Sequence, residues 1–151
     1  MPAIFLKTPR KRISSAIDEQ KVKAEQIAVE LLSYIGERCV EIAREKGSYR
    51  DVTGNLRSSI GYIVVKDGHE VAGGSPKQFA GSKGDGARGA GDAARLLGKL
   101  SPKYGKGLAL IVCAAMEYAE YVEAVHHKDV LTSAELLADE LAKKLLSRYR
   151  K

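Results

Sequence analysis

One long amphipathic pattern in the first third of the chain constrains the fold more than any other feature. Between residues 16 and 46, apolar side chains recur at spacings of three and four, so they form one stripe along an α-helix. The stripe consists of Ala24, Ile27, Ala28, Leu31, Leu32, Ile35, Cys39, Ile42 and Ala43. Ser14 or Ser15 can cap the start of this helix, and Gly47 can end it. The pattern predicts a helix over residues 16–46 whose apolar face needs a partner layer.

The segment after this helix has the pattern of a β-hairpin. Residues 56–65 are rich in Ile, Tyr and Val, which is typical of a buried strand. Asp67 and Gly68 follow, and this pair is favoured in two-residue hairpin turns. Residues 70–72 then begin a return strand, which Gly73 and Gly74 end.

Two further elements complete a small domain. Residues 108–115 indicate another buried strand, while residues 116–125 leave a short helical turn open. Thr132 and Glu135 have the spacing of a capping box at the start of a last helix. The apolar face of that helix consists of Leu137, Leu141, Leu145 and Tyr149. We therefore predict one α+β domain over residues 1–151, with a long N-terminal helix and a C-terminal helix packed on a small antiparallel sheet.

A Gly- and Lys-rich segment over residues 75–107, here called the arm, differs from the rest of the chain. Ten of the fifteen glycines lie between residues 73 and 107. Ordering a backbone costs about 1–2 kcal/mol per residue, whereas burial of an apolar side chain returns about 1.5–3 kcal/mol. The arm offers only five long apolar or aromatic side chains: Phe79, Leu96, Leu97, Leu100 and Tyr104. We expect a long loop, with at most a short helix over residues 92–100, that other chains hold in place.

The positive charge of the chain is concentrated in two places. The formal net charge is +6, and the arm alone carries a net +5. Residues 1–12 contain four basic and no acidic residues, so residues 1–13 form a basic N-terminal extension. Such segments meet acidic protein surfaces or nucleic acid. The candidate contact residues of the arm are Lys77, Lys83, Arg88 and Arg95.

The residue types that carry catalysis do not form a known motif in this sequence. His126 and His127 have no third metal ligand at a familiar spacing, and the glycines of the arm lack the phosphate-loop pattern. Glu117, Glu120 and Glu123 could share an acidic face, but no nucleophile accompanies them. We therefore expect no enzyme activity, no metal and no cofactor.

The remaining composition indicates a protein of the cytosol. Cys39 and Cys113 lie in apolar segments, which predicts two buried thiols and no disulfide. No apolar run approaches the roughly 20 residues of a membrane helix. We expect no membrane partner.

Two short motifs resemble a known protein family. Residues 51–60, DVTGNLRSSI, are similar to the D-T-G-x-L-R-x-S-I signature that follows a long N-terminal helix in small neck or tail-component proteins of siphophage-type tailed bacteriophages. Residues 118–123, YAEYVE, are similar to the Y-A-x-Y-V-E segment of that family. The family then has an aromatic residue and Gly-Thr, where this chain has Ala124, Val125 and His126. Residues 129–134 are a degraded version of its P-F-L-x-P-A segment.

The resemblance implies a structural virion protein at the junction of head and tail. Its members act as oligomeric rings in a neck, tail-completion or tail-terminator position, so the implied partners are further copies, a head-closure ring and the tail tube. Assembly would take place in the cytoplasm of the host bacterium. The alternative from the residues themselves is a small basic nucleic-acid-binding protein that uses the arm, with possible nonspecific contact to phage DNA.

The physical chemistry of the two motifs favours structural roles, with contact between subunits as the second possibility. Thr53 and Gly54 suit a tight turn, which would deliver Leu56 into the core. Arg57 could pair with Glu123 and so join the two motifs. Tyr118 and Tyr121 complete the set of candidate structural or interface residues.

Overall fold

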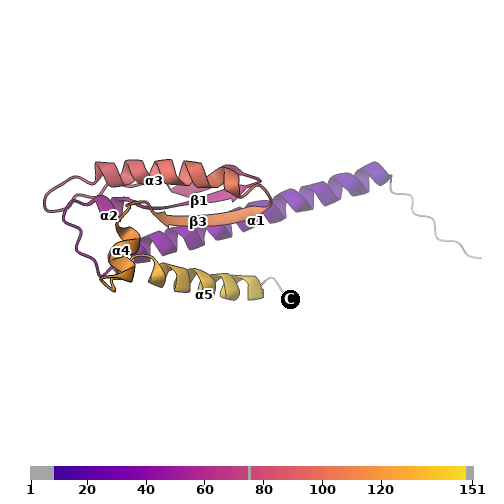
Figure 1. Cartoon of the computed structure of the whole chain (residues 1–151). Helices are drawn as coiled ribbons and strands as arrows, with labels where there is room; N and C mark the ends of the chain where they lie inside the picture. Colours follow the sequence, from indigo (N-terminus) through magenta and orange to yellow (C-terminus); the bar gives the residue numbers. More distant parts are fainter. Residues whose placement is uncertain (1–8, 75, 149–151) are drawn as a thin grey trace, which may run out of the picture.

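A small antiparallel sheet lies between two layers of helices, which confirms the predicted α+β fold (Figure 1). The computed structural model describes residues 9–74 and 76–148. On one side of the sheet lie α1 (Arg10–Glu45) and α5 (Thr132–Arg148), and α3 (Ala87–Leu100) covers the other side. The short helices α2 (Asn55–Ser58) and α4 (Ala119–Ala124) lie together at one end of the domain.

The sheet has the strand order β2-β1-β3. Its strands are β1 (Ile60–Lys66), β2 (His69–Gly74) and β3 (Leu108–Ala114). The predicted hairpin is confirmed: Asp67 and Gly68 have φ angles of 48° and 85°, as a type I′ turn requires. Strand β3 pairs antiparallel with β1 along its full length, so β2 and β3 are the edges.

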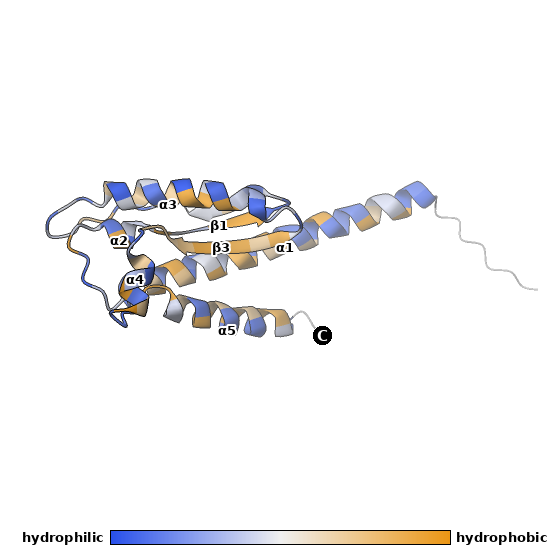
Figure 2. Cartoon of the chain, in the orientation of Figure 1, coloured by the Kyte–Doolittle hydropathy of each residue, from blue (hydrophilic) through white to orange (hydrophobic). Residues whose placement is uncertain are grey.

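The central strand is buried and free of charged residues from Ile60 to Val65 because both of its faces are covered. Successive side chains of a strand point to opposite faces. Ile60, Tyr62 and Val64 therefore join the larger core under α1 and α5, while Ile63 and Val65 join a smaller core under α3. Figure 2 shows β1 and β3 as the most continuously apolar part of the chain.

The two cysteines lie in these two cores, and both thiols are buried as predicted. Cys39 belongs to the core under α1 and α5, and Cys113 to the core under α3. Burial raises the pKa of Cys113 to about 11, against the opposing effect of a backbone hydrogen bond at Gly61.

The arm corrects our expectation most clearly, because it is ordered within its own chain. Its second half is α3, which begins at Ala87, five residues before the expected short helix, and buries Ala93 and Leu97 on the sheet. A turn of 3-10 helix, η1 (Ser101–Lys103), then leads toward β3. Small buried residues and hydrogen bonds stabilise the arm in addition to its long apolar side chains. Phe79 N–H donates to Ser58 Oγ at 2.8 Å, and Lys83 N–H donates to the Val52 carbonyl at 2.9 Å.

Several element boundaries also differ from the prediction. Helix α1 begins at Arg10, directly after Pro9, so residues 10–13 are helical and neither Ser14 nor Ser15 is its cap. Residues 1–8 of the predicted extension lie outside the described residues, as does Tyr149. Residues 55–58 form α2 instead of the start of a strand, and the open segment 116–125 contains α4.

Candidate functional site

The two recognised motifs meet at one end of the domain. Asp51, Thr53 and Leu56 from the first motif and Tyr118 and Val122 from the second line a shallow hollow of about 410 Å³. We call this hollow the motif junction. The chain brings together here two segments that are almost sixty residues apart in the sequence.

The first motif forms the tight turn that the sequence predicts. Gly54 has a φ of 76°, and a Cβ atom there would lie 1.9 Å from the Phe79 carbonyl oxygen. Only glycine avoids both the strain and the overlap. The Asp51 carboxylate accepts a hydrogen bond from Arg57 N–H at 2.9 Å, which helps to start α2. Leu56 then points into the core and is 2% exposed.

The predicted pair of Arg57 and Glu123 is absent among the described residues, and this corrects the expected link between the motifs. Arg57 instead lies beside Tyr49. Burial raises the pKa of Tyr49, and the charge and hydrogen bond of Arg57 oppose that rise. Tyr49 Oη donates to the Ala43 carbonyl at 3.0 Å. The Arg57 side chain is therefore part of the packing between the first motif and the end of α1.

Glu123 has another role, because it holds the beginning of α5. Its Oε1 atom accepts hydrogen bonds from the backbone N–H groups of Leu131 at 3.1 Å and Thr132 at 2.8 Å, and from the Thr132 hydroxyl. Burial raises the pKa of Glu123, but these hydrogen bonds outweigh it and hold the pKa below its ordinary value. The predicted capping box of Thr132 and Glu135 is replaced by this arrangement, in which Asp129 also accepts from Ser133 N–H at 3.1 Å.

The two tyrosines of the second motif are on the surface. Tyr118 lies beside Thr53, Asp51 and Arg88: burial and the charge of Asp51 raise its pKa, while a hydrogen bond with Thr53 and the charge of Arg88 oppose the rise. Tyr121 is exposed and packs edge-on against His126, with ring centroids 5.2 Å apart. Within residues 9–74 and 76–148, His, Cys, Asp and Glu form no group of three that could hold a metal ion.

The basic residues of the arm do not gather in one place. Arg88 and Arg95 both pair with Asp92, at 3.7 Å and 3.1 Å, on the outer side of α3. Lys77 lines a different hollow, beside Phe79 and Arg44. Lys83 contacts the first motif through its backbone, as described above. Since one acidic residue serves two arginines, the positive surface on α3 is partly neutralised.

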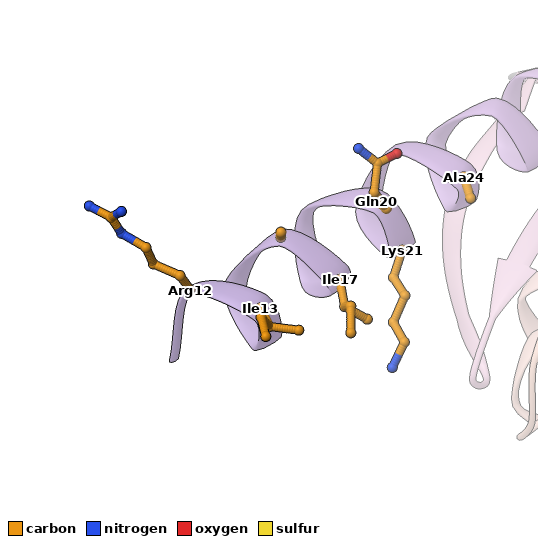
Figure 3. A pocket seen from close by; sticks show the side chains of 7 residues that line it. Arg12, Ile13, Ile17, Gln20, Lys21 and Ala24 are labelled. Atoms are coloured by element: carbon orange, nitrogen blue, oxygen red, sulfur yellow. The ribbon is translucent and has the colours of Figure 1, made fainter. Parts of the chain in front are cut away.

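The sequence prediction missed one prominent surface, the first part of α1. Residues 10–24 are all exposed, and we call them the projecting segment. Its apolar residues include Ile13, which is 38% exposed, and Ile17, which is 50% exposed; both point to the same side of the helix (Figure 3). Ala16 and Ile17 follow Ile13 at spacings of three and four, and Ala24 follows Ile17 at a spacing of seven, so a longer window finds this stripe in the sequence.

Comparison with known proteins adds no assignment to this geometry. None of the helices among the described residues has the length and apolar character needed to cross a membrane. No protein-family model, curated protein or solved structure matches the chain.

Proposed function

We propose that this chain is a structural subunit of the head–tail junction of a tailed bacteriophage. In this role, copies of the chain assemble into a ring that completes the tail or connects it to the head. The ring acts by its geometry, as a continuous channel for DNA, and its partners are the head-closure ring and the tail tube. The chain would enter the virion after assembly in the bacterial cytoplasm.

The projecting segment is the observation that carries this proposal. All fifteen of its residues are exposed, although Ile13, Ile17 and Val22 are large apolar side chains. An apolar surface that one copy leaves open is typical of a site for protein contact. A subunit built for assembly needs such a surface, whereas a protein that works as a monomer does not.

The motif junction supports the same proposal in a second way. The two segments that resemble the phage family pack against each other, with Tyr118 and Thr53 lining the same hollow. Both segments therefore belong to one structural unit, as expected if they were retained as parts of one fold. The contacts of Gly54, Leu56 and Glu123 are those of residues that shape the domain.

The proposal is tested by removing the protein from the phage or prophage whose genome encodes it. A nonsense codon at Glu25 should leave filled heads and separate tails in electron micrographs of the lysate. Supply of the full chain from a plasmid should restore joined particles that contain the protein. Normal infectious particles without the protein would refute the proposal. DNA binding that weakens steeply with added salt would favour the nucleic-acid alternative.

A further inference from the structure

No part of the molecule that the structure describes covers the projecting segment. Helix α1 continues as a single helix past the end of the sheet (Figure 1). The ion pair of Glu25 with Lys66 joins α1 to the tip of the β-hairpin, and Glu25 is the first residue of α1 that is partly buried. The fifteen residues before it extend about 22 Å farther, at about 1.5 Å per residue. Its apolar stripe therefore has no covering partner within residues 9–74 and 76–148.

A mainly apolar groove, which could receive the apolar stripe, lies on the side of the domain opposite α3. Helix α5 packs along α1, and between α5 and β3 there is a groove of about 290 Å³. Its lining is apolar apart from Glu135, and the other lining residues are Cys39, Leu110, Val112, Leu131, Ala134 and Ala138. The outer edge of β3 borders this groove and has no strand partner among the described residues.

The edge strand itself indicates that this groove is covered in the assembled protein. Residues 108–114, LALIVCA, contain no charged residue and no proline. Natural proteins protect exposed strand edges with charges, proline or bulges, or cover them with a helix or loop. The first three devices are missing from β3, and its pairing with β1 is regular. Cover by a helix or loop is the remaining device, and a helix of another molecule can supply it.

The charges of the two surfaces are complementary. The projecting segment has five basic residues and two acidic ones, with Arg10, Lys11 and Arg12 at its tip. The first ten residues of α5 include Glu135, Asp139 and Glu140 and no basic residue. Opposite charges at the rim of an interface steer and orient association. Pairing of two projecting segments side by side would instead bring two basic surfaces together.

From these four observations we infer that the projecting segment of one copy lies in the β3–α5 groove of a second copy. Ile13 and Ile17 enter the groove against Leu110, Val112 and Ala138, and the basic tip faces the acidic rim of α5. The contact joins two different surfaces, so each copy can bind one neighbour on each side; such contacts form a ring when the rotation between copies closes and an open filament when it does not. The inference rests on the proposed function for the expectation of a closed ring.

Cross-linking between two distinguishable copies tests this contact. One full-length protein carries Ile17→Cys, and a second, with a purification tag that changes its mass, carries Ala138→Cys. A short bis-maleimide is added to the mixture. We expect a product with the summed mass of the two chains, while the wild-type protein, whose two cysteines are buried, gives little product.

The matched control moves the cysteine to the outer face of α5. Leu136 is 68% exposed and lies two residues from Ala138, so Leu136→Cys presents a more accessible thiol on another face of the same helix. If Leu136→Cys cross-links to Ile17→Cys as well as Ala138→Cys does, the inferred contact is refuted. Efficient cross-linking of Ile17→Cys to itself would also refute it, in favour of paired projecting segments.

Solution assembly provides a second measurement that does not depend on cross-linking. Ile13→Glu with Ile17→Glu should abolish oligomers seen by light scattering after size-exclusion chromatography. Unchanged circular dichroism would show that the body is folded. If the wild-type protein forms rings while the double variant forms them equally well, the contact is wrong but the proposed function stands. If the nonsense phage matures normally, the proposed function fails whatever surfaces the copies use.

Discussion

Helix α3 and the projecting segment of α1 are helical segments of nearly equal length, but they have opposite surroundings. Helix α3 has 14 residues, and it buries Ala93 and Leu97 at 0% and 3% exposure. The projecting segment has 15 residues, and all of them are exposed. Both are rich in basic residues and carry isolated apolar ones. Amphipathic character alone therefore does not decide which helical segment packs against the sheet.

The length of the sheet explains the difference. A strand of seven residues such as β1 spans about 23 Å at roughly 3.3 Å per residue, and α3 at about 1.5 Å per residue is about 21 Å long. Helix α3 thus matches the face that it covers. Helix α1 has 36 residues and is about 54 Å long, so the sheet can cover less than half of it. The part of this excess that extends past the tip of the β-hairpin is the projecting segment.

Truncation of one aliphatic side chain in each segment tests this comparison with the largest expected effect. Leu97→Ala should lower the free energy of unfolding by about 2–5 kcal/mol, because it leaves a cavity between α3 and the sheet. Ile17→Ala should leave that free energy nearly unchanged in the monomer, since Ile17 is half exposed and, among the described residues, only residues of α1 line the surface around it. Urea denaturation at low protein concentration measures both values. Equal losses for the two variants would contradict the difference that we describe.

Two glycines of α3 test how closely the backbone of this helix approaches its neighbours. A Cβ atom at Gly89 would lie 1.9 Å from the Asn55 carbonyl oxygen, so Gly89→Ala forces α3 away from α2. We expect a loss of about 1–3 kcal/mol in the free energy of unfolding. At Gly91 nothing lies within 4 Å of the added atom, so Gly91→Ala should stabilise the protein by about 0.5–1 kcal/mol through helix propensity. Similar gains for both variants would mean that α3 does not approach α2 closely.

Elements with strong local signals could be predicted from the sequence. The Asp67-Gly68 turn follows from the backbone conformations that a hairpin requires, and the turn at Gly54 follows from the same reasoning. The long helix is evident from its stripe, but it begins at Arg10, before the cap that Ser14 and Ser15 suggest. The predicted extension over residues 1–13 therefore includes Ile13, which belongs to the stripe of the helix.

Contacts between distant segments could not be predicted in the same way. The docking of the arm depends on hydrogen bonds such as Phe79 N–H to Ser58 Oγ, which have no signature in sequence spacing. Glu123 and Arg57 have opposite charges, so the sequence alone favours an ion pair between them. The backbone N–H groups at the start of α5 provide Glu123 with several donors at once, and no single side chain can replace them.

The smallest effect that we predict concerns Glu123, which holds the start of α5 and so one wall of the groove in which we place the projecting segment. Because its hydrogen bonds hold the pKa of Glu123 in the folded protein below the ordinary value of 4.5, the folded state favours the carboxylate. That stabilisation is complete above the ordinary pKa, and it is lost as the pH falls through the lower pKa of the folded state.

Glu123→Gln should therefore lower the free energy of unfolding at neutral pH by about 1 kcal/mol, the usual effect of losing a helix cap. The difference between the variant and the wild-type protein should shrink as the pH falls below 4.5, because the wild-type carboxylate becomes protonated. Glu117→Gln is the matched control, since Glu117 is exposed and has no hydrogen bond among the described residues. A constant difference from neutral to acidic pH would mean that the charge of Glu123 does not stabilise α5, and that the wall of the groove depends on packing alone.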